Sequence, residues 1–319
     1  MKPAVPGVLD YWAGSLFISA KGLFVNAVKY NRNLSIINEL LDQSQWYSDE
    51  QIRDLQGKKL RSLIAHAYDN VPYYNETFKR HGIKPEDIRT IDDIEKIPLL
   101  SKDTIRRNPD AFLARTHRRN FLTDGWTTGT TGKPINVLRT RESITFENAI
   151  LWRQRRWADL DIHCKRVAVF GTIWDKVIIP STVNKPPFWR RNFPDRQILF
   201  SYFHISDETL PMYFEEMRRF RPNFIEGFPS TIQILSNFLK RHDETVPIPN
   251  VFTTSEPLYD VHRNEIAQRF EADVYDHYGQ SERVVAASDC PEHRGLHVHP
   301  EYGVLEIVKD GRGVSPGKT

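Results

Sequence analysis

A short segment near the middle of the sequence carries a high density of groups that can bind phosphate. Residues 127–134 contain four threonine hydroxyls, two glycines and Lys133. Glycine lets backbone N–H groups turn toward an anion, threonine hydroxyls add donors, and lysine supplies a mobile point charge. The segment therefore predicts a phosphate-binding loop rather than an ordinary polar hairpin.

This loop is not the P-loop of nucleotide triphosphatases. That motif needs a glycine where Thr127 stands, and a serine or threonine after the lysine, where Pro134 stands. The residues that follow, 135–138, have the composition of a strand and not of a helix. We therefore expect the loop to join two strands.

Three further polar segments each follow an apolar, strand-like run. Residues 278–282 follow Val274–Tyr275, residues 255–257 follow Val251–Thr254, and residues 226–230 follow Phe224. A carboxylate such as Glu282, on a loop beyond a strand end, can hold Mg²⁺, although a solvated turn glutamate is the commoner case. For residues 255–257 the alternative is an ordinary helix cap with Pro257 in the first turn.

A small group of cysteine and histidine residues lies near the end of the chain. Cys290, His293 and His297 have spacings that a zinc ion could use, with the fourth ligand unidentified. His299 would point to the opposite face of a strand from His297. The alternative is that these are loop histidines beside a free thiol.

The elements that must position these groups follow from the sequence pattern. The first hundred residues are predicted to be helical, with one helix ending at Pro72, Tyr73–Tyr74 extended, and Ser101 capping a later helix. From Thr123 onward, short strand-like runs alternate with helical runs, which is typical of an α/β sheet with crossover connections. The predicted fold is α/β, with a helical region over residues 1–100 and a nucleotide-binding core over 101–319.

Composition excludes several classes of protein. The chain has 44 Lys and Arg against 41 Asp and Glu, a net charge of +3, which excludes a polycationic tail and an acidic disordered chain. Arginines at positions 106, 107, 115, 118 and 119 could form a basic patch, but without a recognised motif we expect no nucleic-acid partner. Two cysteines favour a reducing compartment, and hence the cytoplasm.

The most apolar segment is Tyr11–Tyr30, interrupted by Lys21 and Asn26. Its uninterrupted apolar runs are too short to predict a membrane span, and no signal-peptide cleavage site follows it. We interpret it as a packed helix or a pair of helices, with contact at a membrane surface as the less favoured alternative.

At these landmarks the sequence resembles the adenylate-forming (ANL) superfamily. The Thr/Gly/Lys loop is similar to its phosphate-binding signature, and residues 278–282, Tyr-Gly-Gln-Ser-Glu, to its magnesium and nucleotide signature. Within the superfamily the likeness is to phenylacetate–coenzyme A ligase and its CapK-type relatives of capsule biosynthesis. Further likenesses lie at 66–74, 226–230, 255–257 and 295–298, in the expected order.

The resemblance implies an ATP-dependent acid–thiol ligase of α/β fold, the large N-terminal domain of such an enzyme, with mixed sheets flanked by helices. Such an enzyme joins a carboxylate to the α-phosphate of ATP, releases pyrophosphate, and then passes the acyl group to coenzyme A. Lys133 and Glu282 would be the catalytic residues, with Glu282 binding Mg²⁺. Gly227 and Phe228 would border the acyl substrate. The resemblance assigns the nucleotide to Thr128, Gly129, Thr130, Thr131, Gly132, Lys133, Ser255, Glu256, Pro257, Tyr278, Gly279 and Ser281.

The resemblance also predicts segments that this sequence does not contain. In the family an aspartate that grips the ribose, a hinge, and a small C-terminal domain with a catalytic lysine follow further along. We therefore expect a truncated chain that adenylates poorly by itself. The alternative is a non-catalytic relative, or a fragment, that acts as a binding or assembly factor in capsular or surface polysaccharide production.

Overall fold

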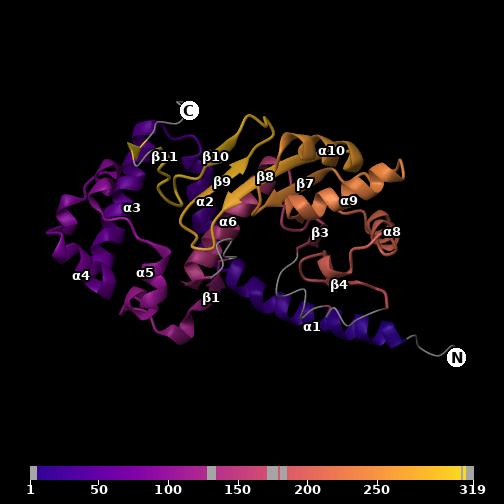
Figure 1. The fold of residues 1–319 in the computed structure, drawn as a ribbon, viewed down its shortest axis with the longest axis horizontal. Helices are drawn as coiled ribbons and strands as arrows, with labels where there is room; N and C mark the ends of the chain where they lie inside the picture. Colours follow the sequence, from indigo (N-terminus) through magenta and orange to yellow (C-terminus); the bar gives the residue numbers. More distant parts are fainter. Residues whose placement is uncertain (1–5, 128–133, 171–178, 180–184, 310–311, 314–319) are drawn as a thin grey trace. The chain divides into compact units, whose positions relative to one another are not determined.

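The structure of the protein is a computed structural model that describes residues 6–127, 134–170, 179, 185–309 and 312–313 (Figure 1). The chain forms two compact units, each built from separate stretches. Unit 1 contains residues 1–31, 151–279 and 287–297, and unit 2 contains residues 32–150, 280–286 and 298–319. The boundary expected at residue 100 falls inside unit 2.

Unit 1 is organised around an eight-stranded sheet of order β10-β9-β8-β7-β6-β3-β5-β4, in which one end residue of β9 and of β10 belongs to unit 2. Strands β5, β3, β6, β7 and β8 run parallel to one another, and the edge strand β4 runs antiparallel to β5. The strands are β3 (Arg166–Val169), β4 (Trp189–Asn192), β5 (Gln197–Phe200), β6 (Phe224–Gly227), β7 (Asn250–Thr254), β8 (Asp273–Gly279), β9 (Ala286–Asp289) and β10 (Leu296–Val298).

Both faces of this sheet are buried. Three helices, α8 (Leu210–Phe220), α9 (Pro229–Arg241) and α10 (Asp260–Phe270), share one apolar core with alternate strand residues such as Ile225 and Val251. The intervening residues point to the other face, where Phe224 and Phe252 pack together with Leu160. Strands buried on both sides explain the near-continuous apolar runs of the sequence. A short 3₁₀ turn, η5 (Tyr202–His204), follows β5.

The apolar segment Tyr11–Tyr30, apart from its last residue, belongs to one long helix, α1 (Pro6–Lys29), which lies along the edge strand β4 (Figure 1). The interpretation as a packed helix is thus confirmed in its single-helix form. Within the described residues, no helix has the length and apolar character that crossing a bilayer requires.

Unit 2 holds the helices of the N-terminal region and a small hairpin. The helices are α2 (Asn33–Ser44), α3 (Asp49–Asn70), α4 (Pro72–Arg80) and α5 (Lys102–Arg107), with 3₁₀ turns η1 (Pro85–Asp87), η2 (Ile91–Lys96), η3 (Pro109–Phe112) and η4 (Arg119–Phe121). Strands β1 (Thr123–Trp126) and β2 (Asn136–Arg139) form the hairpin, β11 (Val308–Lys309) pairs with β12 (Arg312–Gly313), and α6 (Arg141–Trp157) continues into unit 1.

Local signals set most helix ends in unit 2. Ser101 accepts a hydrogen bond from the Thr104 N–H, as its predicted role as a cap requires. The prediction that Tyr73–Tyr74 is extended was wrong, because Pro72 occupies the first turn of α4 and both tyrosines are helical. Proline interrupts a helix that is already running, but its fixed φ suits the start of a new one.

Candidate functional site

The predicted phosphate-binding loop does join two strands, β1 and β2, which pair antiparallel from Thr123–Arg139 to Trp126–Asn136. The ladder extends toward the loop, where the Thr127 N–H donates to the Ile135 carbonyl (3.1 Å) and the Ile135 N–H donates to Thr127 Oγ1 (2.9 Å). The hairpin is therefore closed at the base of the loop. The predicted loop residues Thr128, Gly129, Thr130, Thr131, Gly132 and Lys133 lie outside the described residues.

Ser281, from the second landmark, is hydrogen-bonded to this hairpin. Its hydroxyl donates to the Trp126 carbonyl (3.1 Å), one residue before Thr127. Arg139, at the end of β2, donates from Nε (3.2 Å) and Nη2 (2.7 Å) to the Ser281 carbonyl. Within unit 2, the hydrogen bond from Ser281 to Trp126 joins residues that are 155 positions apart in the sequence. These contacts hold the start of the Ser281–Glu282 turn at the base of the predicted phosphate loop.

A glycine makes room for this arrangement. A Cβ added at the buried Gly125 would collide with the guanidinium of Arg139. Only a residue without a side chain therefore lets Arg139 cross β1 on its way to Ser281.

Glu282 is half-buried in the turn that follows Ser281. Among the described residues its carboxylate makes no hydrogen bond or ion pair. The neighbouring Arg283 is half-buried, and this burial lowers the pKa of its guanidinium. An acidic oxygen ligand of this kind fits Mg²⁺, which takes one or two carboxylates together with phosphate oxygens.

The remaining landmarks lie in unit 1, at the carboxyl ends of parallel strands. Because β6, β7 and β8 pair in register, their ends share one edge of the sheet. There Glu256 Oε2 accepts a hydrogen bond from the Ser230 N–H (3.0 Å), which joins the turn after β7 to the turn after β6. Two segments predicted to line one ligand site are therefore in direct contact.

Residues 255–257 form a loop and not a helix start. Ser255 has a positive φ of 71°, and α10 begins only at Asp260. The helix-cap alternative for this segment is thus wrong. The Glu256 carboxylate instead caps a different helix, α9, by binding a backbone N–H of its first turn.

The predicted substrate residues follow β6. A Cβ on Gly227 would lie 2.7 Å from the Val169 carbonyl oxygen, so the close approach of β3 requires glycine there. The Phe228 ring packs edge-to-face on Phe170, with centroids 5.3 Å apart. These two rings form an apolar surface next to the polar turns. Gly279 ends β8, and Tyr278 before it is 45% exposed, which leaves its ring accessible.

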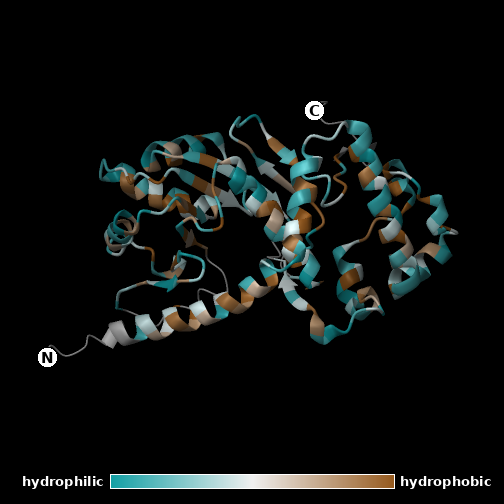
Figure 2. Cartoon of the chain, turned by 180° about the vertical axis from the view of Figure 1, so that it is seen from behind, coloured by the Kyte–Doolittle hydropathy of each residue, from teal (hydrophilic) through white to brown (hydrophobic). Residues whose placement is uncertain are grey.

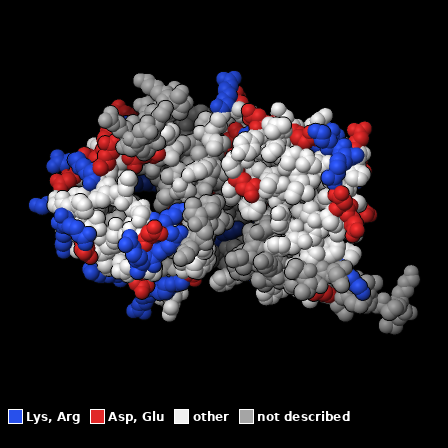
Figure 3. All heavy atoms as spheres, viewed as in Figure 1, with Lys and Arg blue, Asp and Glu red and all other residues white. Residues whose placement is uncertain are grey.

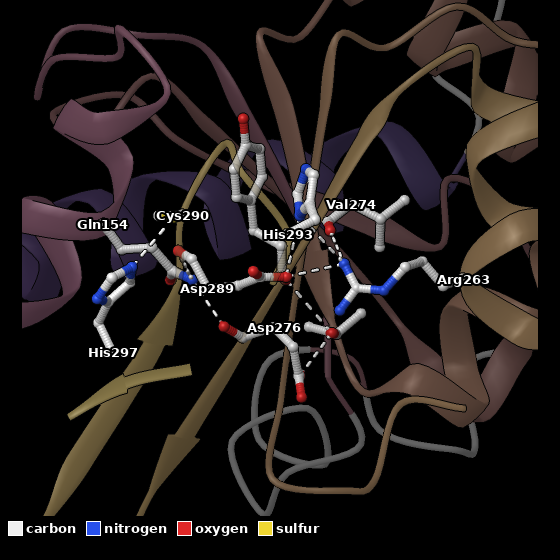
Figure 4. A network of polar contacts seen from close by, with 10 residues as sticks. Gln154, Arg263, Val274, Asp276, Asp289, Cys290, His293 and His297 are labelled. Atoms are coloured by element: carbon white, nitrogen blue, oxygen red, sulfur yellow. Dashed lines mark hydrogen bonds and ion pairs between the residues drawn. The ribbon is translucent and has the colours of Figure 1, made fainter. Parts of the chain in front are cut away.

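A buried polar network that sequence reasoning missed lies between α6, α10 and the strands β8 and β9 (Figure 4). Gln154 donates to the backbone carbonyls of Asp276 (2.7 Å) and Asp289 (3.3 Å). Arg263 donates to Asp289 Oδ2 (2.8 Å), and Thr253 donates to Asp276 Oδ1 (2.8 Å). No sequence motif identifies these pairs, because their members come from separate helices and strands.

The predicted zinc ligands are separated by this network. His297 Nε2 lies 3.2 Å from Cys290 Sγ, but His293 turns away and places Nδ1 3.1 Å from Asp289 Oδ2 (Figure 4). Within the part of the chain that the structure describes, no three His, Cys, Asp or Glu side chains are grouped to hold a metal ion. Within the described residues the three predicted zinc ligands are therefore not brought together, because Asp289 and Arg263 contact His293.

His277 gives unit 1 a specific response to acid. Burial, and secondarily the Arg155 guanidinium, lower the pKa of His277 from its ordinary 6.5 to about 3. Between pH 6.5 and 3, the imidazole of His277 is protonated in the unfolded chain but neutral in the folded chain. The contribution of neutral His277 to the free energy of unfolding is therefore complete above pH 6.5 and falls as the pH drops toward 3. The free energy of unfolding, measured in urea, should fall between pH 7 and pH 4. In the His277→Gln variant we expect this fall to be smaller by about 3 kcal/mol. An unchanged slope would contradict this.

Some arginines of the predicted basic patch, Arg106 and Arg119, form ion pairs, and so does Arg155 further along the chain. Arg106 pairs with Asp103 (2.7 Å), and the buried Arg155 pairs with Glu226 (2.9 Å). Figure 3 shows basic and acidic side chains interspersed over the side of unit 2 that carries α3, α4 and α5. The expectation that the chain has no nucleic-acid partner stays a prediction from the sequence.

Comparison with known proteins gives consistent results. No protein-family model matches the chain. It is 26% identical over 256 residues to protein CapK of Staphylococcus aureus, covering 79% of this chain and 55% of CapK. It is 27% identical over 290 residues to phenylacetate-coenzyme A ligase of Pseudomonas putida, covering 86% of this chain and 63% of the ligase. The chain therefore spans 55% of the length of CapK and 63% of the length of the ligase.

The fold also has solved counterparts. An open conformation of 2-hydroxyisobutyryl-CoA ligase, in complex with 2-HIB-AMP and CoA, superposes with a TM-score of 0.56 at 16% identity, covering 75% of this chain and 57% of that one. The same ligase in its thioesterification state has the same TM-score and covers 78% of this chain and 54% of that one. The predicted likeness to phenylacetate–coenzyme A ligases and to CapK is confirmed by these sequence relatives, and the predicted α/β fold is confirmed by the solved CoA ligases.

Proposed function

We propose that this chain is the nucleotide-binding part of an adenylate-forming ligase that activates a carboxylic acid with ATP. A carboxylate oxygen attacks the α-phosphorus, the bond between the α- and β-phosphates breaks, and pyrophosphate leaves. The acyl group then passes to the thiol of coenzyme A, and AMP leaves. The observation that carries the proposal is the attachment of the Ser281–Glu282 turn, through Ser281 and Arg139, to the base of the Thr/Gly/Lys hairpin.

The chemistry of the residues suggests how the nucleotide is divided among them. Thr128–Lys133 would donate to the β- and γ-phosphates and stabilise the charge that develops on pyrophosphate. Glu282 would hold Mg²⁺, which neutralises phosphate charge. Ser255–Pro257 and Tyr278 would border the adenine, with Tyr278 offering a ring for stacking. Phe228 and Phe170 would provide the apolar wall for the acyl group.

We also propose a second candidate function, which follows from the likeness to CapK-type relatives of capsule biosynthesis that the sequence suggested. In this alternative the chain binds a nucleotide without completing catalysis, and serves as a binding or assembly factor in surface-polysaccharide production. Both functions suit a cytoplasmic protein that uses ATP. They differ in whether a carboxylate is consumed.

ATP-dependent hydroxamate formation across a panel of aliphatic and aromatic carboxylates, together with calorimetric titration of ATP and Mg²⁺, separates these functions. The ligase predicts hydroxamate with at least one acid and pyrophosphate release in equal amount. The binding factor predicts ATP·Mg binding without either product. A chain that binds no nucleotide would contradict both.

A further inference from the structure

Helix α1 packs on unit 1 with the side that carries its small and polar residues. Ser15 Oγ accepts a hydrogen bond from the Arg191 N–H (3.1 Å), and Ser19 Oγ accepts one from the Phe193 N–H (3.1 Å). Ser19 also donates to the Arg191 carbonyl (3.3 Å). These hydroxyls satisfy backbone groups of β4 and of Phe193 just after it; in the sheet formed by the described residues, β4 is an edge strand.

Two glycines on the same side allow this close approach. A Cβ at Gly14 would collide with the Arg190 side chain, and one at Gly22 with Asn192. The helix thus uses Gly and Ser for much of its contact with the sheet, together with the buried Ile18 and with Tyr11, which packs on the core. Five other large apolar residues lie elsewhere on the helix.

They lie on the outward side, where every exposed residue between positions 11 and 30 is apolar. The large ones are Trp12 (48% exposed), Leu16 (62%), Phe17 (63%), Leu23 (62%) and Phe24 (71%). Figure 2 shows the hydrophobic residues recurring along the helix. A surface helix normally buries its large apolar side chains, whereas α1 exposes five of them. We call this surface the α1 face and define it as Trp12, Ala13, Leu16, Phe17, Ala20, Leu23, Phe24 and Ala27.

The spacing on the α1 face is that of a helix which pairs with another helix. Alanines recur every seven residues at 13, 20 and 27, and leucines at 16 and 23 alternate with them at intervals of three and four. This is the heptad spacing of a coiled-coil contact line. Small residues on that line let two helix backbones approach closely, and the flanking phenylalanines extend the contact.

The area of the face is sufficient for a self-association. Its five large side chains leave on the order of 600 Å² uncovered per copy, so two copies would bury about 1,200 Å², the lower end of a standard interface. The face carries no charged side chain, so two identical copies related by a two-fold axis meet without repulsion. Helices that lie on membranes instead combine an apolar face with a Lys- and Arg-rich polar face, whereas the opposite side of α1 is packed on β4.

We propose that the α1 face is a homodimer interface, in which the α1 helices of two copies of this chain pair along the alanine and leucine positions. The association is independent of the proposed ligase function. An interface of this size predicts dissociation in the micromolar range.

Sedimentation velocity of the full chain over a hundredfold range of concentration tests the proposal. The weight-average mass is expected to rise from 37.3 kDa toward the dimer value. The double variant Leu16→Glu/Leu23→Glu should weaken dimerisation at least 100-fold. Leu63→Glu is a matched control, because Leu63 lies on α3 with the same degree of exposure, 61%, and it should leave the dimer unchanged. A wild type that stays monomeric throughout would overturn the proposal.

Cysteine cross-linking tests the geometry without introducing charge. Ala20 is the middle alanine of the line, so Ala20→Cys should meet its own copy and give a disulfide-linked dimer under mild oxidation. Leu63→Cys, and the natural Cys164 and Cys290 of the wild type, report the background. Flotation with vesicles of phosphatidylcholine and phosphatidylglycerol tests the alternative that the α1 face binds a membrane. Binding to vesicles by a protein that neither dimerises nor cross-links would assign the α1 face to a membrane and refute the dimer.

Discussion

Glu282→Gln is expected to lower ATP-dependent hydroxamate formation about 100- to 1,000-fold, because it removes the carboxylate assigned to Mg²⁺ while keeping its shape. ATP titrated with Mg²⁺ should bind wild-type protein more tightly than ATP titrated with EDTA. In the variant this gain from the metal should disappear. The second readout isolates the metal, since a general loss of structure would weaken both titrations equally.

Glu292→Gln is the matched control for this substitution. Glu292 is exposed, and its only ion pair among the described residues is a 3.7 Å contact with Arg294. Its removal should leave activity and both ATP affinities within a factor of two. Retention of a metal-dependent gain by Glu282→Gln would refute the assignment of Glu282 to magnesium.

Arg139→Met is expected to have the second large effect, about 10- to 100-fold on ATP·Mg affinity. It deletes two charge-assisted hydrogen bonds to the Ser281 carbonyl, each worth about 1.5–3 kcal/mol, and so frees the turn that carries Glu282. Arg139 acts here as a positioning residue. Its loss should therefore reduce the magnesium-dependent gain and leave ATP binding in EDTA nearly unchanged.

A double-mutant cycle distinguishes positioning from a loss of charge near phosphate. If Arg139 acts through Glu282, combining Arg139→Met with Glu282→Gln should cost little more than Glu282→Gln alone. Additive losses would contradict this mechanism. Arg141→Met is the matched control, because Arg141 is exposed two residues away and the only hydrogen bond described for it is made by its carbonyl, which accepts from Thr145.

Local rules were enough to predict much of the fold. The alternation of strand-like and helical runs after Thr123 predicted the α/β sheet, because strands buried on both faces must be continuously apolar. Ser101 was predicted as a cap because a hydroxyl before a helix can bind a free N–H. Proline and glycine around residues 132–134 excluded a helix after the phosphate loop. Each inference depends on residues within a few positions of one another, which sequence displays directly.

The order of the landmarks was equally visible, and with it the resemblance to adenylate-forming ligases. The sequence could not show which landmarks touch. Ser281 meets Trp126 across 155 residues, and Glu256 meets Ser230 across 26. Such contacts depend on how strands are ordered in the sheet and where chain segments return, and no short-range pattern records that order.

Two differences between the structure and the sequence predictions have the same physical origin. Tyr73–Tyr74 joined a helix because packing of α4 against α3 favours restarting the helix at Pro72. His293 left the predicted zinc trio because Asp289 and Arg263, which lie on other elements, bind it. Sequence determined the kinds of residues and their local elements. Tertiary structure alone decided their partners, because the free energy of a polar side chain depends on which distant groups come within hydrogen-bond distance.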